Sequence, residues 1–112
     1  FWKGRKMKRR VVITGIGTVN ALGNNVNEFW ENAKKGCIGI ENISSFDTTD
    51  YKVKVAAEVK NLEMKGRLPL KLVKRSERFV HLALLSAKEA IENAGLCMEN
   101  ENAYRVGVWL HK

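Results

Sequence analysis

One stretch decides the fold class: Arg10-Val11-Val12-Ile13-Thr14-Gly15-Ile16-Gly17. Its apolar residues are continuous and mostly β-branched rather than alternating with polar ones, which is typical of a strand covered on both faces. Such strands belong to parallel or mixed sheets that lie between helices. The stretch therefore predicts an α/β fold, in which residues 11–14 form a buried strand that enters a glycine turn.

Gly15 and Gly17 have two interpretations. Glycine can adopt positive φ or let another chain segment pass close by. Alternatively, the pair could belong to a dinucleotide-binding fingerprint, for which Glu41 lies at about the expected distance. Asn20 stands where that fingerprint needs its third glycine, and the next helix starts only near Asn25, too late to hold a pyrophosphate at its N-terminus. We favour the structural interpretation and expect no cofactor.

The next part of the chain predicts a short amphipathic helix and an edge strand. Asn25 is a good helix cap, apolar residues recur at helical spacing over residues 26–33, and Gly36 fits the position just past a helix end. We interpret residues 36–51, which are rich in turn formers, as an ordered loop. Residues 52–59 alternate between apolar and charged side chains, which indicates a strand with one solvated face.

The longest predicted helix covers residues 73–94, and Gly95 follows it where a left-handed residue belongs. Its apolar stripe is formed by Val80, Ala83, Leu84, Ala87, Ala90, Ile91 and Ala94. His81 lies beside this stripe without a partner at helical spacing, so we interpret it as a packing or surface residue. Residues 104–110 predict a second buried strand. This β/α alternation supports a layered α/β fold.

Composition limits the class of protein. The chain has 112 residues, 45% of them hydrophobic and 29% charged, which suits one soluble globular domain at most. No apolar run approaches the ~18 residues of a membrane span, so we expect a cytoplasmic protein with no membrane partner. Cys37 and Cys97 are far apart and have no Cys or His at ligand spacing, which argues against a metal site and favours free thiols.

The formal net charge is +8, and the basic residues fall into two groups. Six of the first ten residues are Lys or Arg, interleaved with Phe1 and Trp2, which favours a small basic nucleic-acid-binding or interaction module as an alternative function. Met7 looks like a natural initiator, so we assign residues 1–7 to a basic tail or upstream sequence and expect no nucleic-acid partner. The second group lies around a predicted helix start and consists of Lys65, Arg67, Lys71, Lys74, Arg75 and Arg78.

An ordered set of short motifs runs through residues 8–108. It includes Lys8-Arg9-Arg10-Val11-Val12-Ile13-Thr14-Gly15-Ile16-Gly17, Leu22-Gly23-Asn24, Gly39-Ile40, Phe46-Asp47, Val73-Lys74-Arg75, Arg78-Phe79-Val80, Ala83-Leu84, Lys88-Glu89-Ala90-Ile91-Glu92-Asn93-Ala94-Gly95-Leu96 and Arg105-Val106-Gly107-Val108. Together these motifs resemble the N-terminal quarter of the β-ketoacyl-acyl-carrier-protein synthases, the type II condensing enzymes of the thiolase-like superfamily. The resemblance implies a partial thiolase-like fold, layered α-β-α-β-α and N-terminal half only, with residues 8–112 as an incomplete synthase domain.

The resemblance also implies an activity and two partners. The full-length enzyme would be a homodimer that catalyses the decarboxylative Claisen condensation of malonyl-acyl carrier protein with an acyl-enzyme in fatty acid elongation. Basic residues at the positions of Lys71, Lys74 and Arg75 would face an acidic acyl carrier protein. A third possible role is that of a regulatory fragment at the dimer surface of a full-length synthase, which the downstream reading frame would distinguish.

The resemblance assigns no catalytic residue to this chain. The family's nucleophilic Cys, two His and a Lys lie far downstream of the resembling region, and Cys37, His81 and His111 do not occupy their motifs. We therefore expect the chain alone to be inactive. Two further departures from the family pattern are Ser76-Glu77, where a Met-Asp pair is common, and the end after Val108, where a Gly/Ser-rich turn would be expected.

Overall fold

The computed structural model describes residues 9–62 and 66–111 of the chain. In these residues the elements follow in the order α1 (Val26–Lys34), β1 (Ile40–Asn42), β2 (Val55–Ala57), α2 (Leu70–Arg75), α3 (Arg78–Ala94), η1 (Met98–Asn100) and η2 (Ala103–Arg105), the last two being 3-10 helices. The structure is therefore a small α/β fragment, as predicted at the level of fold class. Within the described ranges, no helix has both the length and the apolar composition needed to cross a membrane.

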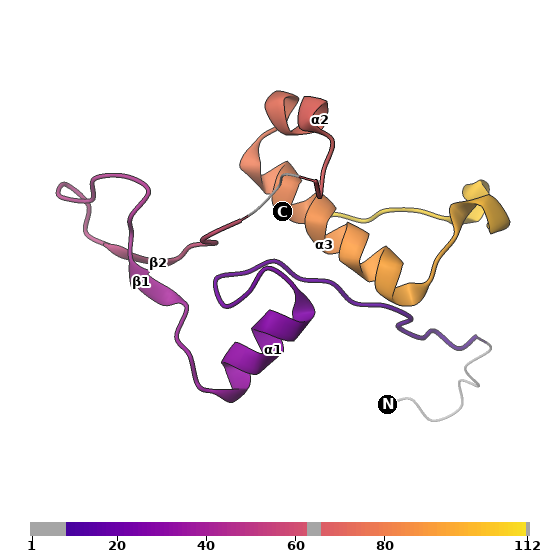
Figure 1. Cartoon of the computed structure of the whole chain (residues 1–112), viewed down its shortest axis with the longest axis horizontal. Coiled ribbons are helices and arrows are strands. Elements are labelled where there is room, and N and C mark those ends of the chain that lie inside the picture. The colour runs from indigo at the N-terminus through magenta and orange to yellow at the C-terminus, as the bar shows by residue number, and fades with distance from the viewer. Residues whose placement is uncertain (1–8, 63–65, 112) are drawn as a thin grey trace, which may run out of the picture.

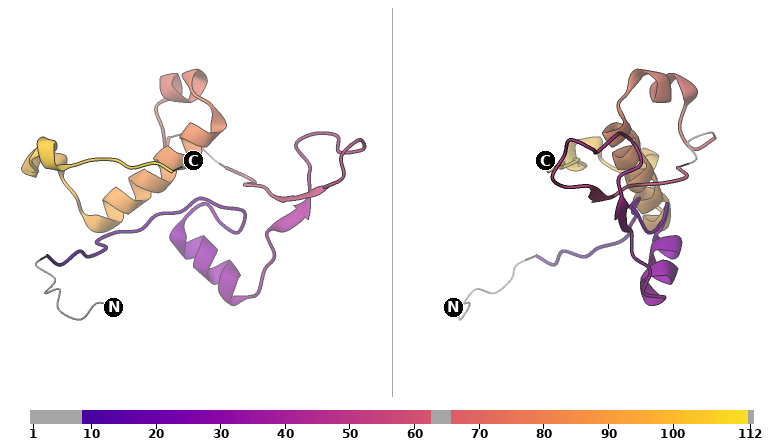
Figure 2. Two further views of the ribbon diagram at one scale, coloured as in Figure 1. Left: turned by 180° about the vertical axis from the view of Figure 1, so that it is seen from behind. Right: turned by 90° about the vertical axis from the view of Figure 1, so that its left-hand side faces the viewer.

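Helix α3 occupies the middle of the molecule (Figure 1), and the other parts are arranged around it. An extended N-terminal segment passes along α3 and leads into α1, while the arm that carries β1 and β2 projects to one side. Helix α2 stands at one extremity, beyond the N-terminal end of α3, and the view from behind shows the same arrangement (Figure 2). This placement leaves α2 open to contact from outside.

Helix α1 forms as predicted because both of its ends are capped. The Asn25 side chain accepts the backbone N–H of Glu28 at 2.8 Å, and the Glu28 carboxylate accepts the N–H of Asn24 at 2.8 Å. At the other end Gly36 has a φ of 72°, and the N–H of Cys37 donates to the carbonyl of Asn32 at 3.0 Å. These contacts form a Schellman motif, in which only glycine adopts the left-handed conformation without strain.

The predicted buried strand over residues 11–14 is wrong. This segment is extended, but among the described residues it pairs with no other strand, and the side chains of Val11 and Ile13 are 92% and 85% exposed. A β-strand requires a neighbouring strand to receive its backbone hydrogen bonds. Here the chain instead bonds to α3 side chains beyond this segment, from the N–H of Ile16 to Asn93 (3.1 Å) and from the N–H of Thr18 to Glu89 (3.0 Å).

Gly15 and Gly17 have the structural role that we favoured, but through close approach rather than a left-handed turn. A Cβ atom at Gly15 would overlap the carbonyl oxygen of Ala90, and one at Gly17 would overlap that of Ser86. The backbone of this segment therefore lies directly on the backbone of α3. The tight turn comes later, where Asn20 and Gly23 exchange backbone hydrogen bonds.

The remaining strand predictions need correction in length and place. The predicted loop over residues 36–51 contains β1, which pairs antiparallel with β2 so that Glu41 lies opposite Ala56. Of the predicted strand over residues 52–59, only Val55–Ala57 forms a ladder. Residues 104–110 do not form a strand among the described residues, because Asn102 caps η2 by accepting the N–H of Tyr104 at 3.1 Å and the chain beyond η2 has no ladder partner.

The single helix predicted over residues 73–94 is divided in two. Helix α2 begins earlier, at Leu70, and ends at Arg75, because the φ of −124° and ψ of 157° of the next residue, Ser76, are extended rather than helical. Helix α3 then runs from Arg78 to Ala94 and is followed, as predicted, by Gly95 with a left-handed φ of 65°. The interruption gives α2 a direction of its own relative to α3 (Figure 1).

Little apolar surface is buried. Leu85 is the fully buried hydrophobic side chain of the described residues, at 1% exposure, and it lies off the predicted stripe, of which Ala87 and Ile91 are exposed. The accessible surface of 10599 Å² exceeds the about 6,200 Å² of a compact protein of this mass. The radius of gyration is 18.4 Å, compared with roughly 13 Å for a compact domain of 100 residues. The elements thus contact one another through few apolar side chains.

Candidate functional site

The three basic residues predicted to contact a partner share one face of α2. Lys74 and Arg75 follow Lys71 by three and four residues, and both spacings place them next to Lys71 on the helix surface. All three are exposed. Lys74 and Arg75 belong to the last turn of α2, where positive charge is favoured by the helix dipole. We call these three residues the α2 basic face.

The other cations of the same sequence cluster are used differently. The Arg78 guanidinium donates to the carbonyl of Val59 at 2.8 Å and so connects α3 to the segment after β2. Arg67 is half-buried, and its carbonyl accepts the ammonium of Lys88 at 2.9 Å. Lys65 lies outside the described residues. Among the described residues of the cluster, Arg78 is thus engaged within the molecule and Arg67 is half-buried, whereas the α2 basic face is exposed.

The basic N-terminal group lies mainly outside the described residues. Lys3, Arg5, Lys6 and Lys8 belong to residues 1–8, for which the structure gives no description, whereas Arg9 and Arg10 are described and exposed. The predicted tail over residues 1–7 is likewise outside the described ranges. The structure thus leaves the nucleic-acid interpretation of this group without supporting geometry.

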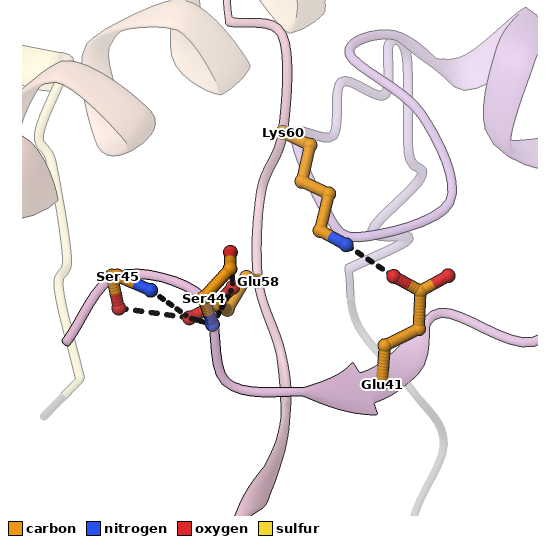
Figure 3. Close-up of polar contacts among 5 residues, drawn as sticks. All are labelled: Glu41, Ser44, Ser45, Glu58 and Lys60. Carbon is orange, nitrogen blue, oxygen red and sulfur yellow. Dashed lines mark hydrogen bonds and ion pairs between the residues drawn. The ribbon is translucent and has the colours of Figure 1, made fainter. Parts of the chain in front are cut away.

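A second polar cluster holds the arm that carries β1 and β2 (Figure 3). The Glu58 carboxylate accepts the hydroxyls of Ser44 and Ser45, each at 2.8 Å, and also their backbone N–H groups at 3.2–3.3 Å. The side-chain hydrogen bonds from Ser44 and then Ser45 contribute most to lowering the pKa of Glu58 to about 2. Glu58 is therefore ionised at neutral pH, with its lone pairs occupied.

Glu41 and Lys60 form an ion pair beside this cluster (Figure 3). The hydrogen bond that the Lys60 ammonium donates to the Glu41 carboxylate is the main cause of a raised pKa of Lys60, so the ammonium stays charged at neutral pH. A general acid or base works best with a pKa near the operating pH, and neither Glu58 nor Lys60 meets that condition. These contacts clamp the arm that carries β1 and β2, and Glu41 takes part in them.

The remaining candidate residues do not converge on one point. Cys37 and Cys97 are exposed free thiols, and His111 is exposed, whereas His81 is 6% exposed. His81 contacts the hydroxyl of Ser76 through Nε2 at 2.9 Å, so it is a packing residue with a polar partner. In the described part of the chain, no group of three Cys, His, Asp or Glu side chains is placed to hold a metal ion.

Sequence reasoning missed Glu89 as an organising residue. One oxygen of its carboxylate accepts the N–H of Thr18 at 3.0 Å, and the other accepts the N–H of Val26, the first residue of α1, at 2.8 Å. Glu89 thus joins the N-terminal segment and α1 to α3. Its sequence surroundings are ordinary for a solvated helix face, and only the contacts over more than 60 residues reveal the role.

Comparison with known proteins places this chain in a family. Residues 8–110 match the family described as "Beta-ketoacyl synthase, N-terminal domain". The chain is 41% identical over 102 residues to 3-oxoacyl-(acyl-carrier-protein) synthase 2 of Staphylococcus aureus, a match that covers 91% of this chain and 25% of the relative. It is 42% identical over 101 residues to the protein of the same name from Coxiella burnetii, covering 90% and 24%. The chain therefore spans about a quarter of the length of the curated relatives it matches.

Proposed function

Because this chain belongs to the β-ketoacyl synthase family, whose N-terminal domain it matches over residues 8–110, we propose that it forms the N-terminal part of a condensing enzyme of fatty acid elongation. The whole enzyme condenses malonyl-acyl carrier protein with an acyl-enzyme by a decarboxylative Claisen reaction. The names of the two relatives, which both refer to a 3-oxoacyl-(acyl-carrier-protein) synthase, support this assignment. Within the whole enzyme, this chain provides scaffold and docking surface. The nucleophilic Cys, the two His and the Lys of the family lie in the rest of the enzyme.

The architecture of the whole enzyme is part of the proposal. We assign residues 8–112 to an incomplete thiolase-like domain, layered α-β-α-β-α when complete and present as a homodimer, with residues 1–7 as a basic tail. The extended segments at residues 10–14 and 106–110 support this, because their apolar side chains are largely exposed: Val12 at 66%, Val108 at 86% and Leu110 at 78%. Strands from the rest of the enzyme would cover these side chains and complete the hydrogen bonding.

The observation that carries the docking part of the proposal is the α2 basic face. Lys71, Lys74 and Arg75 are exposed on one side of a helix that stands at an extremity of the molecule (Figure 1). An acidic carrier protein would meet positive charge there. Exposed ion pairs contribute about 0.2–1 kcal/mol each, so three such pairs provide modest affinity together with faster association that depends on salt. Modest affinity combined with fast association suits a partner that must bind and leave in each catalytic cycle.

The proposal is tested in a grafted synthase, in which this chain replaces the segment of the Staphylococcus aureus relative that it matches. We expect the grafted synthase to elongate acyl chains. Charge reversal of the α2 basic face, K71E/K74E/R75E, should raise the KM for malonyl-acyl carrier protein by roughly threefold or more, because attraction is replaced by repulsion at three positions. The KM for a carrier-free malonyl thioester should not change.

A matched control separates docking from net charge. The variant K35E/K52E/K54E reverses the same number of charges at exposed positions away from α2, and we expect it to leave the KM for the carrier substrate unchanged. Equal effects of the two triple variants would contradict docking at α2. A folded grafted synthase with no elongation activity would contradict the assignment of the chain to the synthase.

A further inference from the structure

Three residues form a hydrogen-bonded relay at the corner between α2 and α3. The Ser76 hydroxyl donates to the carbonyl of Leu72 at 2.6 Å, and His81 Nε2 lies 2.9 Å from the same hydroxyl oxygen. Leu72 belongs to α2, Ser76 ends it, and His81 belongs to the first turn of α3. The His81 side chain is 6% exposed, so its position is fixed by the surrounding protein. The relay therefore connects the helix that carries the basic face to the helix in the middle of the molecule.

The protons of the relay can be assigned by counting donors. A serine hydroxyl has one proton, and that of Ser76 is used in the bond to Leu72. The Ser76 oxygen must then accept in its contact with His81, which requires a proton on His81 Nε2. The neutral His81 is accordingly the Nε2–H tautomer. The imidazolium also carries a proton at Nε2, so the contact persists in both protonation states.

Side-chain caps do not hold the angle of this corner. Its two connecting residues, Ser76 and Glu77, are both extended, and neither Pro69 at the start of α2 nor Glu77 at the start of α3 makes a side-chain capping bond. Short helices of this kind depend on contacts outside themselves, because a helix of six residues is not stable alone. The relay supplies such a contact at the C-terminal end of α2, one residue from Arg75.

We propose that Ser76 and His81 are positioning residues for the α2 basic face, and that their relay sets the angle at which this face meets the acyl carrier protein. The inference rests on the proposed docking function of that face. Ser76 and His81 do not touch the partner themselves. They act by holding α2 in one orientation, so that Lys71, Lys74 and Arg75 reach the carrier together rather than one at a time.

The first test reads the proton assignment directly. In the grafted synthase labelled with nitrogen-15 at histidine, long-range proton–nitrogen spectra at a pH where the rings are neutral should show His81 as the Nε2–H tautomer. His111, which is exposed, provides the internal reference for an unconstrained ring. In Ser76→Ala, the shift of His81 Nε2 should move towards that of His111. A dominant Nδ1–H tautomer in the unmodified chain would overturn the relay.

The second test measures the Kd of the grafted synthase for acyl carrier protein in three serine variants. Ser76→Ala should raise the Kd roughly two- to fivefold, since it removes one net hydrogen bond's stabilisation of the bound orientation. Ser76→Thr should rescue binding, because threonine keeps the hydroxyl and suits an extended backbone. Ser86→Ala is the control, since the Ser86 hydroxyl donates to the Leu82 carbonyl at 2.9 Å, again four residues earlier, without a histidine partner.

The outcomes distinguish the positioning role of Ser76 and His81 from the docking function of the α2 basic face, on which that role depends. If K71E/K74E/R75E weakens carrier binding while Ser76→Ala and Ser86→Ala leave it unchanged, the docking function stands and the relay is wrong. If K71E/K74E/R75E has no effect on the Kd, both are wrong. Circular dichroism of each variant shows whether helix content is retained, and a Ser76→Ala variant that loses helix content without a Thr rescue overturns the positioning role.

Discussion

Glu89 accepts the backbone N–H of Thr18 at 3.0 Å, across 71 residues of sequence. Its other carboxylate oxygen accepts the N–H of Val26 at the start of α1. A side chain of α3 thus provides the hydrogen bonds that a neighbouring strand would give to the N-terminal segment, and it satisfies one of the unpaired donors at a helix N-terminus. This one carboxylate therefore joins both the N-terminal segment and α1 to α3.

Replacing Glu89 by Ala should therefore loosen the N-terminal segment. Two part-buried N–H groups lose a charged acceptor, which costs about 1.5–3 kcal/mol per bond of this kind. In the grafted synthase, hydrogen exchange of peptides that contain residues 16–26 should become faster. Glu92→Ala, at an exposed position of the same helix, is the control and should leave this exchange unchanged. Equal exchange in the two variants would contradict the role of Glu89.

Gly17→Ala should disrupt the contact between the N-terminal segment and α3. The added Cβ would overlap the carbonyl oxygen of Ser86, which is backbone and cannot move aside freely. Overpacking of this kind costs about 1–3 kcal/mol. The measurement is the thermal unfolding midpoint of the grafted synthase, which should fall for Gly17→Ala. A midpoint of Gly17→Ala equal to that of the unmodified grafted synthase would contradict this contact.

The clamp at Glu58 should persist in acid. Its folded pKa of about 2 is lower than the value of an unfolded glutamate, so ionised Glu58 favours the clamped arm above the unfolded pKa. This contribution is lost as pH falls towards 2. A carbon-13 titration of Glu58 should show the low midpoint, and the double variant S44A/S45A should raise it. Ser86→Ala, far from the arm in sequence, should not. A midpoint near 4 in the unmodified chain would contradict the clamp.

The 112-residue chain alone should unfold without a sharp transition. Leu85 and His81 are the buried side chains of the described residues, and this core is too small to supply the about 5–15 kcal/mol of an ordinary domain. Helix α3 should persist best as local structure, since its hydrogen bonds span few residues and Gly95 caps its end. Urea unfolding followed by circular dichroism tests this. A steep two-state transition of a monomer at micromolar concentration would show that the prediction is wrong.

The sequence predicts those parts of the fold that are locally determined. Asn25 and Gly36 define α1, and Gly95 ends α3, because caps and left-handed residues depend on neighbours within one turn. The exposure of the α2 basic face also follows from residue type and spacing. The family resemblance is confirmed by the match over residues 8–110.

The failures have a common physical cause, which is dependence on distant partners. The apolar run at residues 11–14 indicates a buried strand, but a strand exists only where another strand accepts its hydrogen bonds. The division between α2 and α3 at Ser76 was missed because the helical pattern continues through it, and the bond from Ser76 to Leu72 is visible only in three dimensions. The role of Glu89 depends on contacts with residues more than 60 positions away.

The central claim is that the α2 basic face binds the acyl carrier protein through charge. The most direct test is the Kd of the grafted synthase for acyl carrier protein at several salt concentrations. We predict that the Kd rises with salt, and that in K71E/K74E/R75E the Kd is higher at low salt and rises less steeply, because the charges that salt screens have been reversed. A Kd with the same value and the same salt dependence in both proteins would contradict the claim.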